Sequence, residues 1–125
     1  MKRVGFITTN RVFAQGLAAA IKNRPELKLE PILILNSQQT ILDADLSGID
    51  IAVIDVMDMY EDRTSCSLCE RLRKVLPNCR LLLLVAQNHP EERKAVIDAI
   101  RQGLADDFVF HDTSLDYLLA KLAAL

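Results

Sequence analysis

Two segments of the chain are apolar at almost every position. Residues 49–56 read IDIAVIDV and residues 79–86 read CRLLLLVA. Continuous runs of aliphatic and β-branched side chains are typical of strands covered on both faces, as in a parallel sheet between two layers of helices. We therefore predict that both segments are inner strands of such a sheet.

Shorter apolar segments alternate with segments of helical periodicity along the rest of the chain. Strands are predicted at residues 2–8, 27–35 and 107–110. Cap and stop residues delimit the helices, which are predicted from Asn10 to before Pro25, over 37–46, over 64–76, from Pro90 to Gly103, and onward from Asp112 or Ser114. The helix positions expected to face the core include Val12, Phe13, Val75 and Leu115.

Alternation of five strands with five helices predicts an α/β fold. Short connections and right-handed crossovers favour a three-layer αβα sandwich around a five-stranded parallel sheet. Pro31 removes a backbone hydrogen-bond donor from the second strand, which places that strand at an edge of the sheet. The predicted strand order is the flavodoxin-like 2-1-3-4-5, with a single domain over residues 1–125.

Composition excludes several classes of partner and location. The net charge of -2 gives no electrostatic reason to expect nucleic acid or an anionic membrane surface as a partner. The N-terminus runs directly into a predicted strand without a signal-peptide pattern, so we expect a cytoplasmic protein. Three cysteines, Cys66, Cys69 and Cys79, are an odd number and are expected to be free thiols.

The candidate functional residues lie at the carboxyl ends of the predicted strands. Asp55 ends the third strand, at the edge where α/β sheets bind ligands, and it either starts a turn or acts as a reactive carboxylate. Asp58 could return to this edge as a second metal ligand, or remain a solvated loop charge. Thr8 and Thr9 end the first strand, where they could also form part of a phosphate cradle for a small ligand or nucleotide.

The local sequences near these strand ends resemble those of a known family. Residues 76–86 (LPNCRLLLLVA), 15–17 (QGL) and 106–114 (DDFVFHDTS) are similar to the receiver domain of bacterial two-component response regulators, and the likeness spans the chain. The resemblance implies that Asp55 is the phosphoacceptor and that Phe108 is the aromatic switch residue.

Several positions depart from the receiver pattern. Thr8 and Thr9 stand where the family has two acidic residues, Val85 replaces a hydroxyl residue, and His111 replaces a lysine. Mg²⁺ prefers anionic oxygen ligands, and phosphoryl transfer depends on neutralising the charge of the transferred group. The sequence therefore predicts a degenerate receiver, or pseudo-receiver, without a resident cofactor. Mg²⁺ would bind only if the site is functional, with Asp55 and Asp58 as its candidate ligands.

The leading hypothesis is a signalling module of a two-component or phosphorelay system that acts by protein–protein contact, and not an enzyme beyond self-catalysed phosphoryl transfer to Asp55. The resemblance implies a histidine kinase, phosphotransfer or output protein as partner, or a homodimer through the fourth helix, last strand and last helix. Alternatives are a competent phosphoacceptor with an atypical metal site and a flavodoxin-like module that binds a small ligand or nucleotide. The exposed residues expected to contribute to the interaction face are Arg93, Lys94, Arg101, Asp106, Tyr117 and Lys121.

Overall fold

A computed structural model of the chain describes residues 1–8, 10–34, 48–56 and 67–125. The predicted helix over 37–46 lies outside these residues. The strands are β1 (Lys2–Ile7), β2 (Leu29–Ile34), β3 (Ile51–Asp55), β4 (Arg80–Val85) and β5 (Asp107–Phe110). The helices are α1 (Arg11–Lys22), the 3-10 turn η1 (Pro25–Leu27), α4 (Ser67–Val75), α5 (Pro90–Arg101) and α6 (Leu115–Ala124).

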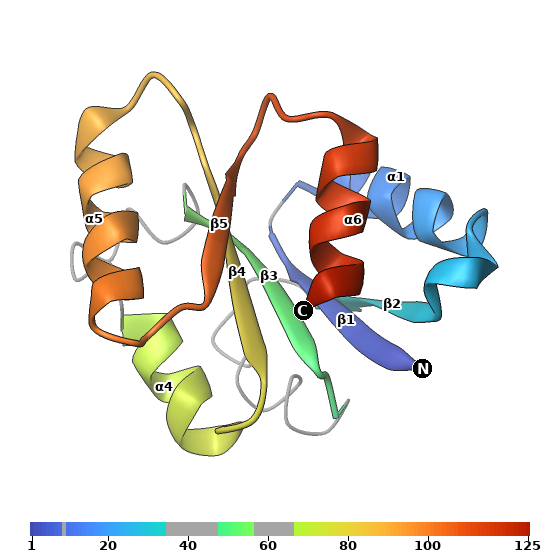
Figure 1. Cartoon of the computed structure of the whole chain (residues 1–125), viewed down its shortest axis with the longest axis horizontal. Helices are drawn as coiled ribbons and strands as arrows, with labels where there is room; N and C mark the ends of the chain where they lie inside the picture. Colours follow the sequence, from blue (N-terminus) through green and yellow to red (C-terminus); the bar gives the residue numbers. More distant parts are fainter. Residues whose placement is uncertain (9, 35–47, 57–66) are drawn as a thin grey trace.

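The five strands form one parallel sheet in the order β2-β1-β3-β4-β5, which confirms the predicted topology. Figure 1 shows α4 and α5 on one side of the sheet and α1 and α6 on the other. Pro31 lies in β2, opposite Val4 of β1. Among the described strands, β2 has a ladder partner on one side alone, and a missing donor is tolerated in such an edge strand.

The two faces of the sheet carry separate apolar clusters. Ala52 and Ile54 of β3 belong to the cluster under α4 and α5, whereas Ile51 and Val53 belong to the cluster under α1 and α6. All four side chains are at most 2% exposed. Burying a Val or Ile side chain contributes roughly 1.5–3 kcal/mol relative to leaving it in water, so a polar residue in this strand would be costly.

Local signals delimit two helices as predicted. The side chain of Asn10 accepts a hydrogen bond from the Phe13 amide at 3.1 Å, and Ser114 accepts one from the Tyr117 amide at 3.1 Å. Each removes one unpaired amide from the first turn of its helix. Gly103 follows α5 with φ 75°, the left-handed conformation that glycine adopts most readily.

Three of the helix positions predicted to be buried are instead exposed, so those predictions were wrong. Val12 is 81% exposed because α1 buries the face formed by Ala14, Leu17 and Ile21, and position 12 lies on the opposite side. Val75 and Leu115 are 40% and 48% exposed. They are the last residue of α4 and the first residue of α6, where a helix extends past the surface that it covers.

Asp106 and Lys121, which were expected to be available on the interaction face, are instead paired within the chain. Lys121 donates to Asp107. The Asp106 carboxylate accepts hydrogen bonds from Arg73 at 2.7 Å, the Leu81 amide at 2.8 Å and Arg80 at 3.2 Å. Burial alone would raise the pKa of Asp106, but its hydrogen bonds and the Arg73 guanidinium lower that pKa overall. The carboxylate therefore joins α4, β4 and the turn before β5.

The substitution Asp106→Asn should lower the free energy of unfolding by about 1–3 kcal/mol at neutral pH. The amide keeps the size of the side chain but loses its negative charge and turns an NH₂ group toward arginine or backbone donors. Urea unfolding followed by circular dichroism measures the loss.

The control is Asp116→Asn, because Asp116 pairs with Arg24 at 3.5 Å while its side chain is 92% exposed. Surface pairs of this kind contribute less than about 1 kcal/mol. The lowered pKa also determines how stability depends on pH. The ionised Asp106 contributes fully to the free energy of unfolding above its pKa in the unfolded chain, near 3.8, and this contribution is lost as the pH falls through its lower pKa in the folded protein. A difference between wild type and Asp106→Asn that grows on acidification would contradict this assignment.

Glu92 lies on the buried face of α5 beside Val96 and Ala99, and it is 6% exposed. Its Oε2 atom is buried, and no hydrogen-bond partner for it lies among the described residues. The first turn of α5 favours a negative charge through the helix dipole, by about 0.3–1 kcal/mol. A buried polar atom left unpaired costs about 1–3 kcal/mol, so the burial of Glu92 destabilises the fold on balance.

We expect Glu92→Met to raise the free energy of unfolding by about 1 kcal/mol, because it replaces the unpaired oxygen with an apolar group of similar length. Thermal and urea unfolding measure the gain. The matched control is Glu91→Met, which makes the same exchange at the exposed neighbouring position and should give no gain. Equal effects of the two substitutions would show that burial of Glu92 is not the cause.

Candidate functional site

Asp55 is the last residue of β3 and lies at the carboxyl edge of the sheet. It is 8% exposed and pairs in register with Leu84 of β4. The chain passes from β1 to β2 on one side of the sheet and from β3 to β4 and β5 on the other. The carboxyl ends of β1 and β3 therefore form the topological switch point, where α/β folds bind ligands. The predicted location of Asp55 is thus the observed one.

His111 is the described side chain whose contact with Asp55 defines the site. It follows β5, and its Nε2 atom lies 3.1 Å from Asp55 Oδ1. An ionised carboxylate only accepts hydrogen bonds, so Nε2 carries the proton and donates it. The His111 amide donates to the Val85 carbonyl at 3.0 Å, which holds the backbone of this residue against the end of β4. The structure therefore joins two predicted site residues from β3 and the end of β5.

Phe13 of α1 is a site residue that the sequence analysis assigned only to the core. Its ring centroid lies 6.1 Å from that of His111, with the ring planes tilted by 53°. Aromatic rings at this separation and tilt attract one another and restrict side-chain orientation. Periodicity marked Phe13 as an inward-facing helix position, but nothing in the sequence spacing linked it to position 111.

Thr8 lies at the end of β1 and is 4% exposed. Its Oγ1 atom accepts a hydrogen bond from the Asn10 amide at 3.1 Å, which shapes the turn into α1. Thr9 and Asp58 lie outside the described residues. Within the part of the chain that the structure describes, no group of three histidine, cysteine or acidic side chains is placed to hold a metal ion. Whether Mg²⁺ binds therefore remains a prediction.

The two other predicted site residues pack in the apolar cluster under α4 and α5. Val85 is fully buried there, and its aliphatic side chain offers no hydrogen-bond donor to a phosphoryl oxygen. Phe108 is partly buried against the same cluster, and its ring meets that of Phe110 edge-on at 5.6 Å and 84°. The structure therefore places both residues in the core beside the site, whereas His111 contacts the carboxylate of Asp55.

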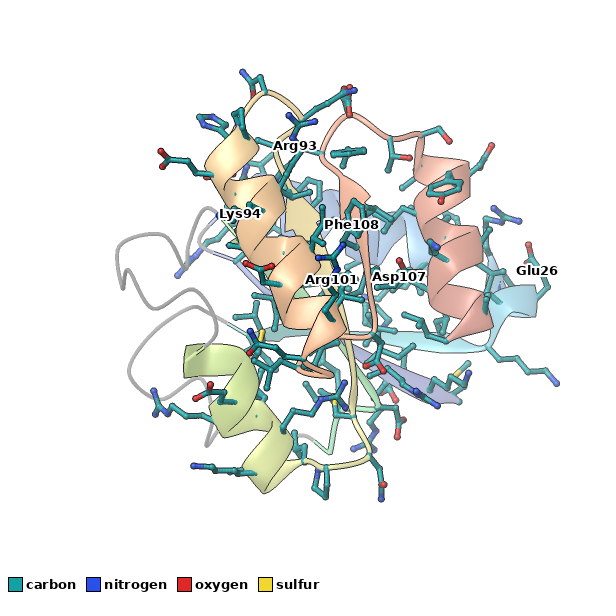
Figure 2. All side chains as sticks on the ribbon, turned by 60° about the vertical axis from the view of Figure 1, so that its left-hand side comes forward. Glu26, Arg93, Lys94, Arg101, Asp107 and Phe108 are labelled. Carbon is teal, nitrogen blue, oxygen red and sulfur yellow. The ribbon has the colours of Figure 1, made fainter. Side chains whose placement is uncertain are left out.

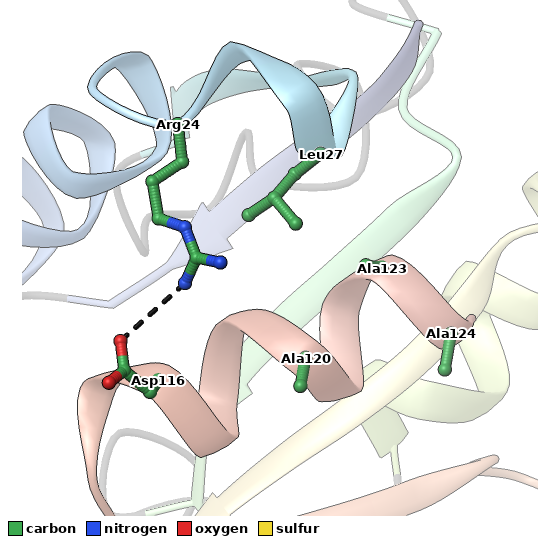
Figure 3. Close-up of a pocket in the computed structure, with 6 residues that line it drawn as sticks. All are labelled: Arg24, Leu27, Asp116, Ala120, Ala123 and Ala124. Atoms are coloured by element: carbon green, nitrogen blue, oxygen red, sulfur yellow. Dashed lines mark ion pairs between the residues drawn. The ribbon is translucent and has the colours of Figure 1, made fainter.

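Several hollows border the described elements, two of which lie against α1 or α6. One, of about 270 Å³, adjoins the site and is lined by Phe6, Thr8, Arg11, Ala14, Gln15, Leu33 and Ile34. The other, of about 930 Å³, runs along α6 beside η1, with the Arg24–Asp116 ion pair at one end and alanines of α6 along its wall (Figure 3). Neither is lined by Asp55 or His111.

Cys69 and Cys79 are buried thiols that form no disulfide in the described part of the chain, as predicted. Cys66 lies outside the described residues. Burial raises the pKa of Cys79 to about 11, so its thiol stays protonated near neutral pH and is a poor nucleophile. In the described part of the chain, none of the helices has the length and apolar character needed to cross a bilayer.

No protein-family model matches this sequence, and no curated protein matches it. Solved structures do match its fold. A response regulator from Thermotoga maritima superposes with a TM-score of 0.75 at 24% identity over 99% of this chain and 96% of its own. The REC domain of AraT, a response regulator from Geobacillus stearothermophilus, gives 0.74 at 19% identity over 98% and 93% of the two chains.

Other similar structures carry different descriptions. A response regulator from Burkholderia pseudomallei, with a phosphorylated aspartic acid, calcium ion and citrate, has a TM-score of 0.75 at 21% identity over 99% of this chain and 69% of its own. An adenylate cyclase from Rhodopirellula baltica has a TM-score of 0.75 at 15% identity, over 98% of this chain and 85% of its own. The shared element is the fold, and this chain has the receiver fold of response regulators.

The hydrogen bond between Asp55 and His111 should appear as a coupling energy of about 1 kcal/mol in a double-mutant cycle. The cycle uses Asp55→Asn and His111→Phe, which keep similar volumes, and measures the free energy of unfolding in urea. Removing either partner alone breaks the same hydrogen bond, so the two losses should not add.

The matched control is the same cycle with His89→Phe, because His89 is an exposed histidine at the N-cap of α5 with no side-chain cap bond. That cycle should be additive within about 0.3–0.5 kcal/mol. Additive losses for Asp55 and His111 would show that their hydrogen bond does not contribute to stability in solution.

Proposed function

We propose that this protein is a receiver-like signalling module of a two-component or phosphorelay system in which Mg²⁺-dependent phosphorylation of Asp55 is impaired or absent. The likeness of the fold to response-regulator receivers supports the signalling role. The hydrogen bond from His111 to Asp55 is the observation that carries the proposal of a silent site.

The chemistry of phosphoryl transfer explains why this contact matters. An attacking carboxylate oxygen must lie in line with the leaving oxygen, while cations neutralise the charge on the transferred group. Here Oδ1 of Asp55 is engaged by His111, and Thr8 supplies a neutral hydroxyl where a carboxylate would help hold a metal. Each change raises the barrier to transfer, because histidine is not the permanently charged lysine of the receiver pattern and a hydroxyl is a weaker metal ligand than a carboxylate.

A module of this kind signals by contact with other proteins. The proposed partners are a histidine kinase, a phosphotransfer protein or an output protein, with a homodimer through α5, β5 and α6 as a further possibility. The Asp55–His111 bond fixes the end of β5 to β3 without a phosphoryl group, so the surface formed by these elements would be held in one state. The protein would then act in the cytoplasm as a constitutive binding partner and not as an enzyme.

The test incubates the purified protein with acetyl phosphate and Mg²⁺ and measures intact mass. Wild type should gain no phosphoryl group. The variant carrying Thr8→Asp, Thr9→Asp, Val85→Thr and His111→Lys restores the acidic pair, hydroxyl and lysine of the receiver pattern, and it should gain one. Adding Asp55→Asn to that variant should remove the gain, with circular dichroism confirming that each variant folds.

The competing function is a competent phosphoacceptor receiver with an atypical metal site. Phosphorylation of the wild-type protein that depends on both Mg²⁺ and Asp55 would establish that function and overturn the silent site. Tight binding of Mg²⁺ with beryllofluoride, measured by titration calorimetry, would also support a competent phosphoacceptor and overturn the silent site.

A further inference from the structure

The hollow of about 270 Å³ lies between the first turns of α1 and the carboxyl ends of β1 and β2. Phe6 of β1 and Leu33 of β2 line it and are partners in register, so their side chains project from the same face of the sheet. Ala14, on the buried face of α1, lines it with them. Pockets for drug-sized ligands measure about 300–1,000 Å³, so this hollow has the size for a smaller molecule.

Apolar side chains form one part of the lining. Phe6, Ala14 and Ile34 are at most 5% exposed, which makes them a fixed part of the fold. Leu33 is 50% exposed, although it lies beside the hollow on a strand of the sheet. Covering exposed apolar surface is favourable in proportion to the area removed from water. This wall therefore matches the apolar body of a ligand.

Hydrogen-bond donors form the other part of the lining. Arg11 and Gln15 are exposed and lie four residues apart on α1, so they share one side of that helix. Arg11 takes part in none of the ion pairs that join described residues. Thr8 is 4% exposed, and its Oγ1 atom accepts a hydrogen bond from the Asn10 amide at 3.1 Å. A hydroxyl that accepts one hydrogen bond can also donate one, so this buried group can bind an anion.

The combination of the two walls restricts the chemistry of the occupant. A guanidinium binds a carboxylate through two parallel hydrogen bonds, and no acidic residue is among the described residues that line the hollow. A bare anion such as phosphate would leave Leu33 uncovered. A neutral apolar molecule would leave the charge of Arg11 unmatched. A compact molecule with a carboxylate at one end and an apolar body at the other satisfies both walls.

We infer that this hollow binds a small organic acid, with its carboxylate on Arg11 and Thr8 and its apolar body against Leu33. The inference goes beyond the proposed function, because Asp55 and His111 are not among the residues that line the hollow. Binding there requires neither a phosphoryl group nor a metal ion. A ligand held on α1 would give the signalling module an input that does not depend on phosphorylation of Asp55.

The experiment titrates the full chain with benzoate, cyclohexanecarboxylate and hexanoate, three monocarboxylates whose apolar bodies differ in shape. Chemical-shift changes in the ¹⁵N-labelled protein should map to the carboxyl ends of β1 and β2 and to the first turns of α1. The tightest of the three should have a Kd of about 1 mM, as expected for a ligand of this size. Benzamide has the shape of benzoate without its charge and should bind at least about tenfold more weakly.

Substitutions at each wall test the two halves of the site. Arg11→Gln removes the charge and should weaken binding at least about tenfold, whereas Arg11→Lys keeps the charge without the paired hydrogen bonds and should weaken it several-fold. Leu33→Ser should also weaken binding several-fold. Both positions are exposed, so the variants should fold, as circular dichroism can verify.

The matched control is Arg93→Gln, which makes the same exchange on another helix and should leave binding within about twofold. Figure 2 shows Arg93 on α5, the helix that covers the opposite face of the sheet from α1. An equal loss in Arg93→Gln and Arg11→Gln would overturn the inference, since only net charge would then matter.

The ligand series gives three further outcomes that would overturn the inference. The first is the absence of saturable binding by all three acids. The second is equal binding of benzoate and benzamide, which would show that the carboxylate is not recognised. The third is tighter binding of inorganic phosphate than of the three acids, which would show a site for a bare anion.

Failure of this inference is distinguishable from failure of the proposed function. Asp55→Asn should bind benzoate as the wild type does. A wild-type protein that gains a phosphoryl group at Asp55 and also binds the acid through Arg11 would overturn the silent site and support the inference. A protein that gains no phosphoryl group and binds none of the acids would support the silent site and overturn the inference.

Discussion

The inner strands β3 and β4 are covered on both faces, and this constraint determines where the protein can place polar chemistry. From Ile51 to Ile54 every side chain of β3 enters one of two apolar clusters. A charged group anywhere in that run would lose its hydration without gaining a partner, at a cost of several kcal/mol. The first position where a carboxylate can stand is the strand end, which is where Asp55 lies.

The same constraint explains how much of the fold was predictable. Continuous apolar runs marked the inner strands, Pro31 marked an edge strand, and Asn10 and Ser114 marked helix starts through side-chain oxygens that act over three residues. These signals are local or depend on burial of a whole segment. Val12 was misassigned because an apolar residue on the exposed side of a helix costs little, so its presence does not identify the buried face.

The sequence predicted only part of the candidate site. Asp55 and His111 could be placed at the same edge from strand order, but their 3.1 Å contact depends on where the chain leaves β5 and on the hydrogen bond of the His111 amide to Val85. Asp106 was expected to be exposed because charged residues near turns commonly are. Its three hydrogen bonds come from α4 and β4, more than 20 residues away in sequence, and no local pattern records them.

The strand β5 connects the candidate site to the surface of α5. His111 ties its carboxyl end to Asp55, while Phe108 and Phe110 pack in the cluster that also holds Val96 on the inner side of α5. A change in the position of β5 would therefore require repacking beneath α5, and close-packed interiors resist such change. Because the Asp55–His111 bond already holds β5 in place, the outward face of α5 is set by the fold itself.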